Sequence, residues 1–75
     1  MNEIQFPLGI FARIHPNGVA VTGYETWENE TQAAGYRAIL DTVAKALEAG
    51  AEPKALRRPI VQMVQSLRGC GIAMI

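Results

Sequence analysis

The sequence predicts an α+β fold of two layers in the order ββααβ, with a helical hairpin packed on one face of a small sheet. Three observations predict it. Apolar and polar residues alternate over residues 4–14, Asn17-Gly18 follows as a turn signal, and a period of about 3.6 residues begins near residue 32. A chain of 75 residues is the size of one domain, so residues 1–75 are expected to share a single core.

The first strand is expected at Ile10–His15. Every even position from Ile4 to Ile14 is apolar, which is typical of a strand with one buried face. Pro7 cannot donate a ladder hydrogen bond, and Gly9 weakens a strand. The part before Ile10 is therefore expected to be an edge segment or a bend.

A β-hairpin is expected to join this strand to a second one at Val19–Tyr24. A two-residue Asn17-Gly18 loop keeps apolar residues on one face, whereas a three-residue loop mixes the two faces, so the shorter loop is favoured. Pro16-Asn17-Gly18 also suits a type I turn with a bulge. The favoured register pairs Ile14 with Val21, Ala12 with Gly23, Phe11 with Tyr24, Arg13 with Thr22, and His15 with Ala20.

The central element is an amphipathic helix at Gln32–Leu47. Its apolar arc contains Ala33, Tyr36, Ile39, Leu40, Val43 and Leu47. Asn29 and Gln32 have the spacing of a capping box, and Gly50 suits the residue after the helix. Gly35 costs about 1 kcal/mol relative to Ala, which indicates either simple tolerance or the close approach of another backbone.

The second helix is expected in two parts, a short turn at 53–57 and a main helix at 59–68. Pro59 would cost about 3 kcal/mol inside a helix, so it is expected in a first turn or at a kink. Gly69-Cys70-Gly71 would end the helix. Ile72–Ile75 would then form a last strand, paired either within the sheet or with another subunit.

Composition excludes several classes of protein. The formal net charge is zero, which disfavours nucleic-acid binding. One cysteine and one histidine allow neither an internal disulfide nor a structural zinc site, and no cofactor motif is present. The sequence contains neither a signal-peptide pattern nor a membrane-spanning run, so a cytoplasmic protein is expected. Because the domain is small and 49% of its residues are hydrophobic, a homo-oligomer or an obligate partner is expected.

The candidate binding residues lie on the strand face that the helices leave uncovered. We call this surface the outer face, and it consists of Phe11, Arg13, His15, Thr22 and Tyr24. Aromatic residues and arginine are enriched at protein interfaces, so the outer face is expected either to bind a partner or to hold two copies together. The simpler interpretation of His15 is a solvated histidine beside a turn, and that of Cys70 is a small buried apolar residue.

A second candidate is a basic patch on the second helix, formed by Lys54, Arg57, Arg58 and Arg68. Arginine suits phosphate or carboxylate groups, although such a patch is more often a solvated face that meets nearby acidic residues.

The resulting expectation is a non-enzymatic interaction protein, an inhibitor or adaptor that binds a protein partner, of the size often encoded by phage or accessory genes. The alternative is a small-ligand protein that binds a nucleotide or anionic metabolite at a homo-oligomer interface. There Phe11 or Tyr24 would stack on the ligand, and Arg13, Arg57 or Arg58 would hold its phosphate.

Overall fold

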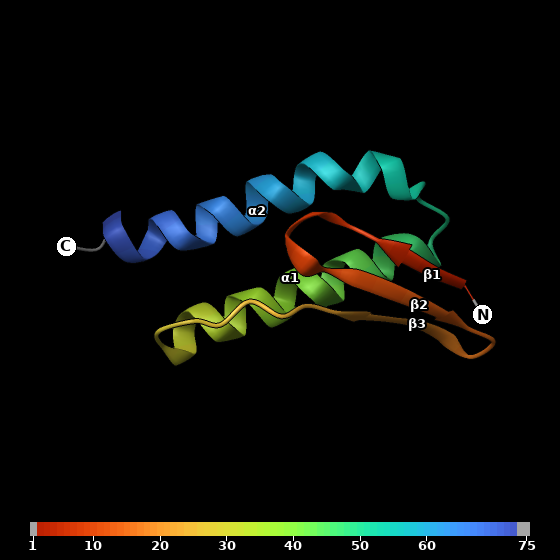
Figure 1. Cartoon of the computed structure of the whole chain (residues 1–75), viewed down its shortest axis with the longest axis horizontal. Helices are drawn as coiled ribbons and strands as arrows, with labels where there is room; N and C mark the ends of the chain where they lie inside the picture. The colour runs from red at the N-terminus through yellow and green to blue at the C-terminus, as the bar shows by residue number, and fades with distance from the viewer. Residues whose placement is uncertain (1, 74–75) are drawn as a thin grey trace.

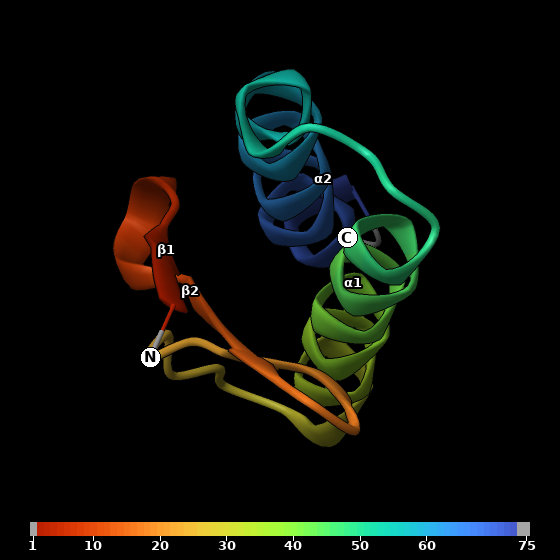
Figure 2. The same cartoon turned by 90° about the vertical axis from the view of Figure 1, so that its right-hand side faces the viewer.

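A computed structural model describes the backbone of residues 2–73 and the side chains of residues 3–69. The elements are β1 (Asn2–Gln5), the short 3-10 turn η1 (Pro7–Gly9), β2 (Phe11–His15), β3 (Gly18–Thr22), α1 (Glu30–Glu48) and α2 (Pro53–Ala73). The strands form one antiparallel sheet in the order β1-β2-β3. The helices run in opposite directions along the sheet (Figure 1). Both helices lie on the same side of it (Figure 2). The α+β class is therefore confirmed.

The expected fifth element, a C-terminal strand, is wrong where the structure describes it. Ile72 and Ala73 belong to α2, and residues 74–75 lie outside the described part of the chain. The split of the second helix is also wrong, because α2 runs continuously through Pro59 and past Gly69. Pro59 leaves the Ala55 carbonyl without its helical donor, but both residues are exposed, so water can bond that oxygen.

The first strand breaks where Pro7 and Gly9 predict a bend. The chain reverses through η1, with Leu8 at φ 65° and Gly9 at φ 75°, and β1 and β2 pair on either side of it. Backbone N–H of Phe6 donates to the carbonyl of Ile10 at 2.8 Å and closes this reversal. The segment before Ile10 is therefore an edge strand followed by a turn.

The hairpin register differs from the favoured one by two residues. The observed pairs are Phe11 with Thr22, Ala12 with Val21, Arg13 with Ala20, Ile14 with Val19, and His15 with Gly18. The loop is Pro16-Asn17. An Asn17-Gly18 loop would make Pro16 close the ladder, and proline has no N–H to donate there. A shift of two preserves both faces, because side chains alternate with period two.

The core lies between the sheet and the two helices. Its most enclosed side chains are Ile10, Val43, Ile60 and Val64, each at most 1% exposed. The other buried side chains are Phe6, Ala12, Tyr36 and Ile39. None of the helices described over residues 2–73 is both long and apolar enough to cross a membrane.

Helix α1 begins as its sequence predicts. The Asn29 side chain accepts a hydrogen bond from backbone N–H of Gln32 at 2.8 Å. The Gln32 side-chain oxygen accepts a hydrogen bond from the Asn29 side-chain amide at 3.5 Å. In a full capping box it would accept from the backbone N–H of Asn29 instead, so the box is incomplete.

Two glycines mark close approaches. A Cβ on Gly35 would lie 2.7 Å from Leu67 Cδ1, so the expected neighbour is a side chain of α2 and the backbone interpretation is wrong. A Cβ on Gly23 would lie only 1.8 Å from Tyr36 Oη.

Candidate functional site

The outer face is the helix-free side of the sheet, and its aromatic residues form a cluster. Phe11 and Tyr24 have ring centroids 5.7 Å apart with their planes tilted by 31°. Phe11 pairs across the strands with Thr22, so Tyr24 reaches it from the diagonal position two residues further on. Phe11 is half-buried, whereas Tyr24 is 73% exposed.

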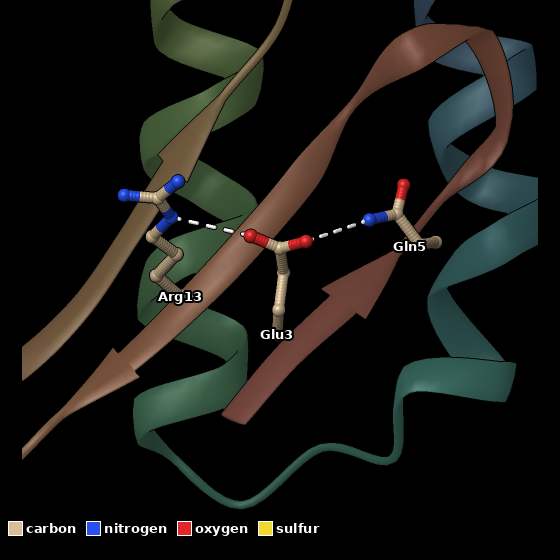
Figure 3. Close-up of polar contacts among 3 residues, drawn as sticks. All are labelled: Glu3, Gln5 and Arg13. Carbon is tan, nitrogen blue, oxygen red and sulfur yellow. Dashed lines mark hydrogen bonds and ion pairs between the residues drawn. The ribbon is translucent and has the colours of Figure 1, made fainter. Parts of the chain in front are cut away.

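Arg13 joins the aromatic cluster to the polar residues of β1. Its guanidinium carbon lies 5.7 Å from the centroid of the Phe11 ring. Its Nε donates to Glu3 Oε2 at 3.2 Å, and Gln5 Nε2 donates to Glu3 Oε1 at 3.0 Å. Figure 3 shows this row of Arg13, Glu3 and Gln5 across two neighbouring strands. Because Glu3 and Gln5 pair with Arg13 and Phe11 respectively, the strand register itself places these side chains next to one another.

This polar row contributes to the stability of the fold only as much as a surface interaction does. The side chains of Arg13 and Glu3 are 52% and 40% exposed. Exposed ion pairs contribute about 0–1 kcal/mol to stability. The row therefore orients Arg13 beside Phe11 more than it holds the fold together.

The two remaining outer-face residues lie at opposite ends of the hairpin formed by β2 and β3. Thr22 is exposed beside Phe11, and His15 is exposed at the hairpin end, where it pairs with Gly18. A shallow depression at this end is lined in part by His15, Pro16 and Glu48. The five residues of the outer face thus share one side of the sheet, and Phe11 contacts both Tyr24 and Arg13.

The basic patch is not a single surface. Arg68 forms an ion pair with Glu25 and lies 5.8 Å over the Trp27 ring, as expected for a cation that meets the acidic segment before α1. Arg57 lies at the other end of α2 and donates from Nη1 to the backbone carbonyl of Gln5 at 3.4 Å. Arg58 is exposed on the same turn of the helix.

A cluster that sequence patterns do not reveal surrounds the Tyr36 hydroxyl. The rings of Tyr36 and Trp27 lie 5.3 Å apart, and both Tyr36 Oη and Trp27 Nε1 are buried without a hydrogen-bond partner. Burial raises the pKa of Tyr36 above its usual 10.0, and the Glu25 carboxylate adds to this, while the backbone N–H of Glu25 and the Arg68 guanidinium act in the opposite direction. This N–H approaches the hydroxyl without hydrogen-bond geometry. No local period could predict a cluster assembled from a loop and both helices.

An apolar groove lies between the two helices, and no sequence pattern predicts it. It has a volume of about 450 Å³ and is lined by Gly35, Ile39, Pro59, Gln62, Met63, Ser66 and Leu67.

Among the described residues, no group of three or more His, Cys, Asp or Glu side chains is close enough to hold a metal ion. The side chain of Cys70 lies outside the described set.

Comparison of the chain with protein-family models, curated proteins and solved structures finds no match.

Proposed function

We propose that this chain is a small non-enzymatic interaction protein, an inhibitor or adaptor, that binds a protein partner through its outer face. The observation that carries the proposal is the contact of Phe11 with both Tyr24 and Arg13 on the helix-free side of the sheet. Tyrosine and arginine are enriched among the residues that supply most binding energy at protein interfaces, and phenylalanine is enriched at interfaces as well.

The contribution of this aromatic cluster to the stability of the sheet explains only part of its arrangement. A cross-strand aromatic pair contributes roughly 0.2–1 kcal/mol to a sheet, and such packing accounts for the half-buried Phe11. It leaves Tyr24 73% exposed, although a partner could cover that ring at little entropic cost. The exposed part of the tyrosine ring is therefore surface that a partner would bury.

Two occupants suit this surface, namely a second copy that meets it face to face and a different protein. Both complexes would bury the aromatic pair, and the hydrogen-bonded row of Arg13, Glu3 and Gln5 would lie at the rim of the interface. Self-association would also account for the high apolar content of so short a chain.

The test is a double substitution, Phe11→Ala with Tyr24→Ala, followed by native mass spectrometry at several concentrations and by binding measurements on any co-purifying protein. We expect assembly or partner binding to be lost while the circular dichroism spectrum stays that of the folded chain. Leu8→Ala is the control, because Leu8 is an exposed apolar side chain in η1 that does not belong to the outer face. Unchanged assembly and binding in the double variant would refute the proposal.

A second candidate function is the binding of an anionic small ligand. Arg57 and Arg58 form no ion pair with any described side chain, which favours an anion from outside the chain. A thermal-shift screen with nucleotides tests it, because a ligand at 100 times its Kd stabilises a protein by about 2.7 kcal/mol. The absence of a shift across the panel would count against this candidate.

A further inference from the structure

The outer edge of β1 carries backbone groups that no other strand uses. In an antiparallel ladder the hydrogen-bonded pairs alternate along the strand. Phe6 is bonded to Ile10, so Ile4 is bonded to Ala12, and the backbone N–H and C=O groups of Glu3 and Gln5 point away from the sheet. The contact between Arg57 and the Gln5 carbonyl confirms that this oxygen faces outward.

The opposite edge of the sheet is arranged differently. By the same alternation, the backbone N–H of Val19 points outward from β3, and it donates to Glu48 Oε2 at 3.3 Å. Helix α1 packs along β3, with Leu40 and Ala44 lining the shallow groove against Val19 and Val21. Helix α2 instead packs against η1, beyond the end of β1. The open edge of the sheet is therefore β1.

The basic side chains without an ion pair to a described residue gather at the start of α2, from which Arg57 reaches this edge. Four of the seven basic side chains, Arg13, Arg37, Lys45 and Arg68, form ion pairs within the chain. The other three are Lys54, Arg57 and Arg58, and none of them pairs with a described carboxylate. All three fall within the first six residues of α2, whose first turn contains no acidic residue.

The helix itself gives these cations little stabilisation. The amino end of a helix carries a partial positive charge that disfavours a cation in the first turn, where Lys54 lies, and the effect fades beyond that turn. Glu52 precedes the helix and forms no ion pair with any of the three. Apart from the bond of Arg57 to the Gln5 carbonyl, these cations are therefore available to an outside anion.

We propose that the outer edge of β1 accepts an extended, acidic segment of a protein partner as a fourth strand. The segment would bond the outward backbone groups of Glu3 and Gln5, and its carboxylates would meet Arg57 and Arg58. Arg57 already reaches the edge, so its contact with the Gln5 carbonyl would be exchanged for a stronger, charge-assisted bond.

This inference rests on the proposed function and names the kind of partner. Gln5 is the cross-strand neighbour of Phe11, so a strand added to β1 would lie directly beside the aromatic cluster. Strand addition obtains affinity from backbone bonds and specificity from alternate side chains. One partner could therefore contact the edge and the outer face together.

The binding test uses a soluble probe peptide of alternating glutamate and valine, titrated into ¹⁵N-labelled protein to millimolar concentration and followed by NMR. We expect saturable shifts of the Glu3 and Gln5 amide signals and slower hydrogen exchange at those two amides. A matched peptide with lysine in place of glutamate should not bind. Unmoved Glu3 and Gln5 signals, or equal binding of the lysine peptide, would overturn the inference.

Two variants separate the backbone and charge contributions. Gln5→Pro removes an outward N–H and leaves the ladder bonds between β1 and β2, so it should abolish binding without unfolding the sheet. Arg57→Glu with Arg58→Glu should weaken peptide binding by more than about tenfold, because it removes the charge-assisted bonds and places like charges opposite the glutamates of the peptide.

The control for the charge reversal is Arg37→Glu with Lys45→Glu. It changes the net charge by the same amount on α1, where both cations are exposed and away from β1. An equal loss of affinity in this control would mean that the peptide responds only to net charge, which would refute the edge site.

The same measurements distinguish the two proposals. If Phe11→Ala with Tyr24→Ala abolishes partner binding while the edge variants do not, the proposed function stands and the edge inference is wrong. If the edge variants abolish peptide binding and the aromatic variant changes neither assembly nor binding, the edge site stands and the outer face is not the interface.

Discussion

Substitution of Gly23 by alanine should be among the most damaging small changes in the chain. The added Cβ would lie 1.8 Å from Tyr36 Oη, 2.8 Å from Tyr36 Cζ and 3.2 Å from Ile10 Cγ1. Ordinary contacts between such atoms are 3.4–4 Å. Tyr36 would have to move by more than an ångström, but it is 5% exposed and packs against Trp27.

The expected cost follows from this geometry. Overpacking a core costs about 1–3 kcal/mol, and the partial loss of a buried aromatic ring places Gly23→Ala at the upper end, about 2–3 kcal/mol. A domain of this size has about 4–11 kcal/mol of total stability. At about 4–8 °C per kcal/mol, the melting temperature should fall by about 10–20 °C.

Urea denaturation followed by circular dichroism and by Trp27 fluorescence measures this cost. Gly35→Ala is the matched control, because its Cβ would meet the flexible end of Leu67 and the helix gains about 1 kcal/mol from alanine. We therefore expect a change within about 1 kcal/mol for Gly35→Ala. In a Tyr36→Leu background, Gly23→Ala should cost much less. Equal midpoints for wild type and Gly23→Ala, or a larger loss for Gly35→Ala, would refute the reasoning.

Four further predictions concern α1 and its neighbours. Tyr36→Phe removes a buried hydroxyl without a partner, so it should raise the unfolding free energy by about 1 kcal/mol. Burial raises the pKa of Tyr36 above 10.0, so the unfolded chain loses the hydroxyl proton at a lower pH than the folded chain does. The unfolding free energy of the wild type should therefore fall as pH rises above 10.0, and Tyr36→Phe should not show that fall. Asn29→Ala removes the cap of α1 and should cost about 1 kcal/mol in a urea titration, whereas no change would show that the cap is dispensable. Arg68→Ala should shift Trp27 emission to longer wavelength, because the guanidinium over the ring is replaced by water, and its exposed ion pair should cost less than about 1 kcal/mol.

Local patterns predicted the elements whose determinants are local. Alternation of apolar residues identified the side of β2 that buries Ala12, although Ile14 near the end of the strand is exposed. Asn29 with Gln32 identified the start of α1. The bend at Pro7 and Gly9 follows from the backbone chemistry of those two residues alone. The outer face was predictable for the same reason, because period two determines which side chains share a side of a strand.

The errors arose where a local signal competed with tertiary packing. Gly69 and Gly71 indicate a helix end, yet a glycine costs only about 1 kcal/mol inside a helix, and α2 continues to Ala73. The hairpin register was wrong because the Asn-Gly signal was given more weight than the missing N–H of Pro16. The contacts of Arg68 with Glu25 and of Arg57 with Gln5 join residues far apart in the chain, which no periodicity encodes.

The order of the elements, with α2 after the sheet and α1, has a consequence for how the protein folds during synthesis. Each strand pairs with its neighbour in sequence, so the sheet and α1 require only short loop closures. Ile60 and Val64, both 0% exposed, nevertheless belong to an element that leaves the ribosome after the sheet and α1. The emerging chain therefore exposes the apolar surfaces of β2 and α1 until residues 53–67 arrive, and a fragment ending at residue 52 should bind hydrophobic dyes and chaperones that the chain of residues 1–75 does not.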